Sequence, residues 1–230
     1  MKIHGFNKLT LLDYPGKMAA TIFLGHCNFR CPFCQNGGLV LNPDKEPVIP
    51  TEEVLKVLKK RQGILDGVCI TGGEPTLHPD LPDFISQIKQ LGYAVKLDTN
   101  GSHPQVIKEL VERKFIDYVA MDIKNAPCRY AETAGVSHLN LQAVKESVEF
   151  LLSEAVYYEF RTTVTRQLHT EVEFRQIGEW IAGCKRYFLQ GYQESSQVIS
   201  PVFSAYTRDE LEVFRELLSE YISDVQIRGL

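Results

Sequence analysis

The chain has 230 residues, of which 44% are hydrophobic and 23% are charged, proportions typical of one globular domain with a sizeable core. Its formal net charge is -4 at pH 7, so no general positive field favours nucleic acid or an anionic membrane surface. The first residues lack the apolar core of a secretory signal, and no apolar stretch is long enough to cross a bilayer. We therefore expect one domain spanning residues 1–230, a cytoplasmic location, and neither nucleic acid nor membrane as a partner.

Short apolar runs alternate with amphipathic stretches from residue 19 onward, a pattern that predicts strands and helices in turn. The predicted strands are residues 19–24, 67–71, 94–98, 118–122, 157–164 and 187–190. The predicted helices are residues 51–61, 81–91, 104–113, 139–153 and 171–182. A closing helix at 208–221 and a short edge strand at 225–227 complete the pattern, and residues 37–50 are predicted to form one extended loop.

Strands separated by helices of this length imply right-handed β–α–β crossovers and a parallel sheet. Roughly six such units, fewer than the eight of a full barrel, predict an α/β fold that is a partial, open (β/α)6-type TIM barrel. Thr51 is the predicted N-cap of the first helix, because Glu52 and Glu53 follow it at the positive end of the helix dipole.

Three of the six cysteines, Cys27, Cys31 and Cys34, are crowded into eight residues. Gaps of three and then two residues let one short loop wrap one face of a small inorganic cluster. A structural zinc site needs four protein ligands, and this loop supplies three. An iron–sulfur cluster is held by cysteine thiolates, and three of them leave one iron of a [4Fe–4S] cluster open to an outside ligand. The spacing therefore favours a [4Fe–4S] cluster, with three unrelated core cysteines or a zinc site as alternatives.

The other cysteines and several histidines show no ligand spacing. One of Cys69, Cys128 and Cys184 would complete the alternative zinc site. We expect all three to be buried as small hydrophobes, because free cysteine is often simply buried. The histidines left without a role, as surface groups or supports behind a site, are His4, His26 and His169.

A glycine-rich turn, Thr71-Gly72-Gly73-Glu74-Pro75, follows a predicted strand at its carboxyl end, where α/β folds build their active sites. Glycines allow a backbone to approach a ligand closely, and Glu74 with nearby carbonyl groups can accept hydrogen bonds from an ammonium group. A plain strand-to-loop turn is the alternative interpretation.

Charged residues end three further strands. Asp98 and Asp122 each close a predicted strand, Lys124 follows Asp122, and Arg161 lies in the fifth strand. We expect them at the same rim, where Lys124 or Arg161 would stabilise a ligand carboxylate. Asp98 would bind ribose hydroxyls or, with Asp122, hold a cation. The alternative is that these acids and bases pair with one another or cap helices.

The cysteine spacing, with the aromatic residue Phe33 before Cys34, resembles the signature of the radical S-adenosylmethionine (SAM) superfamily. This resemblance implies that SAM chelates the open iron through its amino and carboxylate groups, so the cofactors are a [4Fe–4S] cluster and SAM. It also implies that Phe33 packs beside the adenine and that the run from Gly72 to Glu74 binds the SAM amino group.

The cysteine run to Asn36 and the glycine-rich turn, together with the runs at residues 12–17, 98–101 and 121–124, resemble activating proteins of glycyl radical enzymes. The resemblance is strongest to the anaerobic ribonucleoside-triphosphate reductase activating proteins. That family implies an oxidoreductase that forms a radical on a backbone glycine of its partner, with a flavodoxin- or ferredoxin-type reductant. Some activases carry an extra cysteine-rich insertion between the cysteine loop and the glycine-rich turn. This chain lacks it, which implies a single cluster. The residues 187–193 lack the histidine of pyruvate formate-lyase activases, which argues against a formate-lyase partner.

Two alternative functions are also consistent with the cysteine motif. A radical SAM enzyme related to 7-carboxy-7-deazaguanine synthase would act on a small molecule in place of a protein. A non-catalytic adaptor would use the cysteines to fold a metal-bound loop for partner binding.

Overall fold

The computed structural model describes all residues, Met1–Leu230, and divides them into two compact units. The first unit comprises Met1–Asn28, Gly38–Thr99 and His103–Ala120. The second comprises Phe29–Gly37, Asn100–Ser102 and Met121–Leu230. The chain therefore passes between the two units several times, and the single domain over residues 1–230 stays a prediction.

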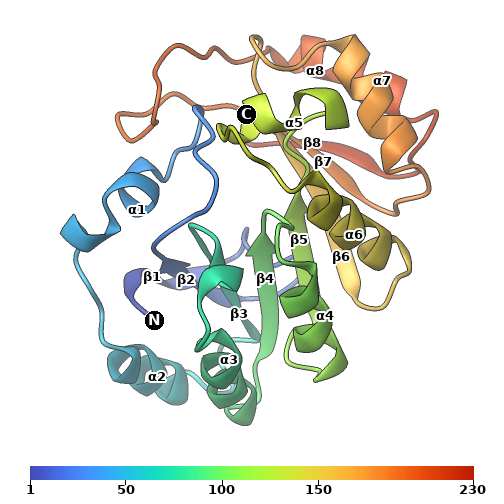
Figure 1. Cartoon of the computed structure of the whole chain (residues 1–230). Coiled ribbons are helices and arrows are strands. Elements are labelled where there is room, and N and C mark those ends of the chain that lie inside the picture. Colours follow the sequence, from blue (N-terminus) through green and yellow to red (C-terminus); the bar gives the residue numbers. More distant parts are fainter. The chain divides into compact units, whose positions relative to one another are not determined.

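The first unit is built on four strands that lie in chain order, β1 to β4 (Figure 1). Their bounds are Ile3–Thr10, Ala19–Leu24, Gly67–Gly72 and Ala94–Thr99. β1 pairs with β2 in the antiparallel sense, whereas β2, β3 and β4 are parallel. A fifth strand, β5 (Tyr118–Asp122), begins in the first unit and ends in the second.

Helices connect the parallel strands of the first unit, as the alternating pattern predicts. These are α1 (Gly37–Leu41), α2 (Thr51–Lys60), α3 (Leu81–Gln90) and α4 (Pro104–Glu112), with the 3-10 turns η1 (Pro43–Lys45) and η2 (Pro75–Leu77). Each of the longer helices buries an apolar stripe, for example Phe84, Ile85 and Ile88 in α3, which is the pattern of a helix that packs on a sheet.

Three details of the first unit differ from the sequence predictions. Pro50, not Thr51, is the N-cap of α2, and no side chain caps this helix, because the proline ring carries no hydrogen-bond acceptor. The predicted loop at 37–50 contains α1 and η1. β1 escaped prediction because its side chains do not alternate between buried and exposed positions; only its ends, Ile3 and Thr10, are buried.

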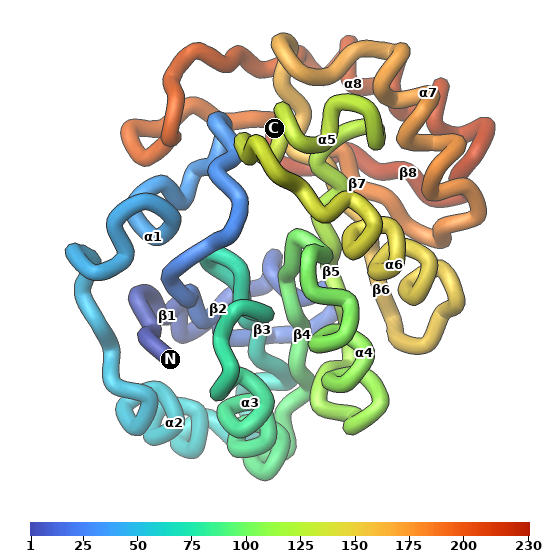
Figure 2. Tube along the Cα trace, viewed as in Figure 1, coloured from blue at the N-terminus to red at the C-terminus, as the bar shows by residue number.

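The second unit continues the parallel pattern with β6 (Tyr157–Val164), β7 (Tyr187–Gly191) and β8 (Val225–Arg228) in that order (Figure 2). Its helices are α5 (Tyr130–Ala134), α6 (Leu141–Leu152), α7 (Glu171–Trp180) and α8 (Arg208–Leu218), with the 3-10 turn η3 (Pro127–Arg129). α7 and α8 lie side by side, and the rings of Phe174 and Phe214 are 4.6 Å apart.

The two faces of the first unit's sheet differ in chemistry. Ile22, Ile70 and Leu97 are in register and fully buried, whereas the adjacent row places Thr21, Cys69 and Lys96 on the other face. Because side chains alternate along a strand, an apolar face and a polar face follow from the same three strands.

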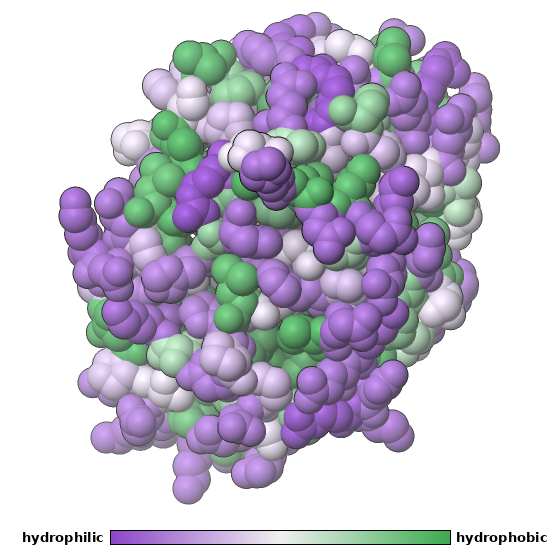
Figure 3. Space-filling view, in the orientation of Figure 1, coloured by the Kyte–Doolittle hydropathy of each residue, from purple (hydrophilic) through white to green (hydrophobic).

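The surface is mostly polar, and Figure 3 shows hydrophilic residues over much of the drawn face with smaller apolar areas between them. None of the helices combines the length and the apolar character that a membrane crossing demands.

Candidate functional site

The cysteine loop extends across the boundary between the two units. Cys27 belongs to the first unit and follows β2, while Cys31 and Cys34 belong to the second. A turn joins the latter two, because the Cys34 amide donates to the Cys31 carbonyl at 2.9 Å. Burial raises the pKa of the Cys31 thiol to about 11, against the opposing charge of Lys124. Both thiols must lose protons before they bind a metal.

The glycine-rich turn is packed directly against the backbone that leads into Cys27. The Gly73 amide donates to the Leu24 carbonyl, and the Glu74 amide donates to the His26 carbonyl, both at 2.8 Å. A Cβ on Gly73 would lie 1.9 Å from the His26 oxygen, and one on Gly72 would lie 2.3 Å from the Leu24 oxygen. The glycines are thus needed for this close backbone contact, in addition to the ligand contact predicted for them.

The Glu74 carboxylate supports the turn from inside the protein. Its side chain is buried, and its Oε1 accepts hydrogen bonds from the Thr76 amide at 3.1 Å, the Thr76 hydroxyl at 2.6 Å and the Thr99 hydroxyl at 2.8 Å. The Thr76 contacts cap the 3-10 turn η2. Glu74 therefore has a structural role, and its contact with a ligand ammonium group stays a prediction.

Asp98 is paired with a buried lysine that was not among the predicted site residues. The Lys96 ammonium forms an ion pair with Asp98 and lies 3.8 Å from the Cys69 sulfur. Only 2% of the Lys96 side chain is exposed, and such a buried charge requires a partner. A lysine between two apolar residues of a predicted strand was the signal that could have identified it.

In the second unit, Asp122, Lys124 and Arg161 lie together. Asp98, which was expected at the same rim, belongs to the first unit, so its place beside them stays a prediction. The Lys124 ammonium is 2.8 Å from one carboxylate oxygen of Asp122, and the Arg161 Nε is 2.5 Å from the other. Burial would raise the pKa of Asp122, but the charges of Arg161 and Lys124 hold it well below its ordinary value. These residues pair with one another, as the alternative interpretation expected, and they form a compact charged group at the end of β5.

His169 contacts the backbone of this charged group at Lys124. The ring is fully buried; Nδ1 accepts a hydrogen bond from the Thr165 amide at 3.2 Å, and Nε2 lies 2.9 Å from the Lys124 carbonyl. Burial lowers the pKa of His169 to about 4, so the ring is neutral at pH 7. A neutral ring that accepts at Nδ1 carries its proton on Nε2, which therefore donates a hydrogen bond to the Lys124 carbonyl.

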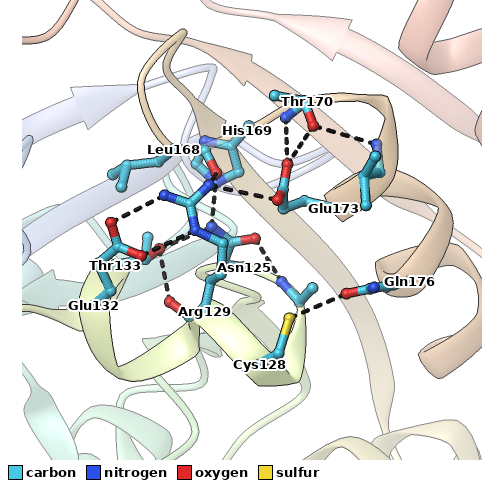
Figure 4. Close-up of polar contacts among 12 residues, drawn as sticks. Asn125, Cys128, Arg129, Glu132, Thr133, Leu168, His169, Thr170, Glu173 and Gln176 are labelled. Carbon is cyan, nitrogen blue, oxygen red and sulfur yellow. Dashed lines mark hydrogen bonds and ion pairs between the residues drawn. The ribbon is translucent and has the colours of Figure 1, made fainter.

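The loop that carries His169 is held by the polar network drawn in Figure 4. Asn125 and Arg129 both donate to the Leu168 carbonyl, at 2.9 and 3.1 Å. Glu173 accepts from the amide and the hydroxyl of Thr170 in a capping box at the start of α7. Since the network fixes both neighbours of His169, the imidazole has a defined position.

Phe33 is buried between two aromatic rings. Its ring centroid lies 6.5 Å from that of His169 and 6.1 Å from that of Phe203, both in edge-on contact. Phe33 is thus a core aromatic residue of the second unit, and its contact with adenine stays a prediction.

The remaining cysteines divide into two kinds. Cys69 and Cys184 are buried, as predicted. Cys128 is exposed, contrary to the prediction, and its sulfur donates to Gln176 at 3.2 Å. It lies in η3, a surface turn that buries none of its residues.

The donors present fit an iron–sulfur cluster in kind, because cysteine thiolates are the ligands of such clusters. No group of three or more His, Cys, Asp or Glu side chains is close enough to hold a metal ion. Within the second unit only Cys31 and Cys34 are available from the motif, since Cys27 belongs to the first. Assignment of the three ligands therefore remains a proposal.

Residues 21–166 match the sequence pattern of the family described as "Radical SAM superfamily". The chain belongs to this superfamily. A [4Fe–4S] cluster and SAM are its family cofactors. The chain thus has the α/β fold with an open parallel sheet that was predicted, and not a closed barrel.

Two relatives and one solved structure illustrate the similarity. A Methanocaldococcus jannaschii protein named as a candidate glycyl-radical enzyme activating enzyme is 31% identical over 235 residues, which cover 99% of this chain and 96% of that protein. A Thermococcus kodakarensis protein named as a candidate GTP 3′,8-cyclase is 30% identical over 128 residues, 54% of this chain and 41% of that protein. A domain of a Bacteroides vulgatus pyruvate-formate lyase-activating enzyme, 19% identical, shares the fold with a TM-score of 0.58 over 71% of this chain and 99% of that one.

Proposed function

We propose that this protein is a radical SAM activase that generates a glycyl radical on a partner enzyme. The observation that carries the proposal is the 31% identity to a candidate glycyl-radical enzyme activating enzyme along 99% of this chain and 96% of that protein. Similarity of this extent includes the regions outside the radical SAM match at residues 21–166, where features that select a partner would differ between families.

The proposed cluster ligands are Cys27, Cys31 and Cys34. The proposed SAM contacts are Phe33, Gly72, Gly73, Glu74, Asp98, Asp122, Lys124 and Arg161. When bound, the cluster and SAM supply a carbon-centred radical through one-electron cleavage of the sulfur–C5′ bond. The protein's task is to orient that chemistry and to exclude water.

The charged group of the second unit suits the carboxylate of SAM. Lys124 and Arg161 both carry positive charge, and Asp122 holds the two cations together at 2.8 and 2.5 Å. Lys124 and Arg161 also carry the N–H donors that suit a ligand carboxylate. Lys124 also opposes the rise that burial causes in the pKa of the Cys31 thiol, so the same cation favours the thiolate form that a cluster requires.

The partner that we propose is anaerobic ribonucleoside-triphosphate reductase, on the motifs at residues 12–17, 98–101 and 121–124. The reaction is then an oxidoreductase step fed by one electron from a flavodoxin- or ferredoxin-type protein. None of the six cysteines forms a disulfide, which suits a reducing compartment such as the cytoplasm.

A second candidate function is a radical SAM reaction on a small molecule. It is favoured by the 30% identity to a candidate GTP 3′,8-cyclase. That similarity covers 54% of this chain, compared with 99% for the activase relative, so we rank the activase first.

The test begins with SAM cleavage. The protein, reconstituted with iron and sulfide under argon and treated with a strong reductant, is expected to convert SAM to 5′-deoxyadenosine and methionine, and Cys31→Ala is expected to abolish this. Purified reductase is then added, and a glycine-centred doublet is sought by electron paramagnetic resonance. If deoxyadenosine accumulates but no candidate partner acquires the doublet, the small-molecule function replaces the activase. A protein that takes up only zinc would point to the metal-binding adaptor.

A further inference from the structure

The cysteine loop of the second unit, Phe29–Gly37, is held mainly by segments that are distant in sequence. It contains turns but no strand, and it reaches a helix only at Gly37. Its local contacts include the turn between Cys31 and Cys34. Such a short irregular segment has many conformations unless outside contacts select one of them.

One set of outside contacts comes from the strap, which we define as residues Gln197–Ser200. The Ser200 amide donates to the Pro32 carbonyl at 2.8 Å, and the Ile199 amide donates to the Cys34 carbonyl at 3.2 Å. In the reverse direction, the Gly37 amide donates to the Gln197 carbonyl at 3.1 Å. The strap therefore pairs with the cysteine loop backbone to backbone, much as a short strand would.

Other contacts hold the beginning and the middle of the loop. The Arg30 amide donates to the Ala134 carbonyl at 2.8 Å, and a Cβ on Gly135 would lie 2.1 Å from the Arg30 carbonyl oxygen. Phe203, just beyond the strap, packs its ring against Phe33. The loop is thus fixed at several points along its length.

We propose that the strap is a positioning element for the cysteine loop: its backbone hydrogen bonds hold the loop in the conformation in which Cys31 and Cys34 receive the cluster. The cluster part of this statement rests on the proposed function, whereas the holding of the loop does not. If the loop is already ordered, binding of the cluster does not have to include the entropy cost of ordering it.

Gly37 offers a sharp way to displace the strap. A Cβ at this position would lie 2.4 Å from the Gln197 carbonyl oxygen, which is backbone and cannot rotate away. The neighbouring Gly38 is the matched control, because a Cβ there would meet the end of the flexible Glu46 side chain. Both residues lie in α1, so alanine changes helix propensity similarly in the two variants.

The experiment measures thiol alkylation in the full-length, metal-free protein under argon, with iodoacetamide and peptide mapping by mass spectrometry. In Gly37→Ala we expect Cys31 and Cys34 to react faster than in the parent by on the order of tenfold, as the loop opens locally. Gly38→Ala is expected to react like the parent. Exposed Cys128 and buried Cys184 serve as internal references and are expected to keep their rates.

Unchanged rates at Cys31 and Cys34 in folded Gly37→Ala would overturn the proposal. If Cys184 also reacts faster, the variant has lost its fold. Amide hydrogen exchange of the parent protein then tests the proposal instead. The proposal requires the Ile199 and Ser200 amides to be protected; exchange at unprotected rates in the folded parent would refute it.

Cluster uptake supplies the second readout. At limiting iron, Gly37→Ala is expected to incorporate iron and sulfide more slowly than Gly38→Ala, by a factor comparable to the gain in alkylation. Equal uptake would reject the positioning role for the cluster. If the parent itself takes up no iron, the proposed function fails, and the alkylation result still reports on the strap.

Discussion

Lys96 and Asp98 form the buried ion pair of the first unit, with 2% and 12% of their side chains exposed. Removing one member of a buried pair leaves an uncompensated charge, which costs about 3 kcal/mol or more. We therefore expect Lys96→Met to lower the free energy of unfolding by about 3 kcal/mol, measured by urea titration at pH 7. The double variant Lys96→Met with Asp98→Asn is expected to recover part of this loss. A double variant that is no more stable than Lys96→Met would contradict the ion-pair explanation.

His169 gives a pH dependence whose sign follows from its burial. An ordinary histidine pKa of 6.5 falls to about 4 in the folded protein, so the unfolded chain binds the proton more readily. The contribution of His169 to stability is full above pH 6.5 and is lost as the pH falls toward 4. From pH 7 to pH 5 this loss is about 2 kcal/mol.

His169→Gln has no titratable ring, so its stability should fall by about 2 kcal/mol less than that of the parent between pH 7 and pH 5. Urea titrations at both values measure the difference. The control is His138→Gln, because His138 is exposed. Equal pH dependence in the parent and in His169→Gln would show that His169 is not the source of the stability lost between pH 7 and pH 5.

At the scale of elements, the glycine-rich turn after β3 fixes the path of the chain from β2 into the cysteine loop. The 1.9 Å approach of a Cβ on Gly73 to the His26 oxygen sets two backbone segments against each other, and neither can yield as a side chain would. We expect Gly73→Ala to destabilise the protein by about 3 kcal/mol or more, the range of severe backbone and packing changes.

Gly63→Ala is the comparison for this turn. Gly63 has a positive φ of 77°, but no atom lies within 4 Å of its added Cβ, so the cost is that of the backbone conformation alone, about 1 to 2 kcal/mol. Thermal unfolding of the two variants measures the difference. A Gly73→Ala protein as stable as Gly63→Ala would mean that the two segments can move apart.

At the scale of the whole molecule, one cluster per chain is expected, because only one group of cysteines has ligand spacing. Iron and sulfide analysis after anaerobic reconstitution should give about four of each per chain. Cys128→Ser should leave these values unchanged, since Cys128 lies in an exposed turn beside Gln176. A content near eight irons, or a loss of iron in Cys128→Ser, would contradict a single cluster on the three-cysteine motif.

Much of the fold and part of the site followed from local pattern. Helices such as α7 and α8 and buried strands such as β3 were predictable because amphipathic periodicity and apolar runs are local properties of the sequence. β1 was missed because it lacks alternation. The strand ends predicted that Asp98, Asp122, Lys124 and Arg161 would meet, since parallel strands present their carboxyl ends at one edge. The structure brings the last three together.

The sequence by itself determined the superfamily, through the spacing of Cys27, Cys31 and Cys34, because ligand spacing within one loop is a local property. Only the tertiary structure decided that the His169 ring contacts the Lys124 carbonyl. It also decided that the strap pairs with the cysteine loop. These contacts join residues that lie far apart in the chain, and burial, which creates the need for each partner, arises only when the chain folds.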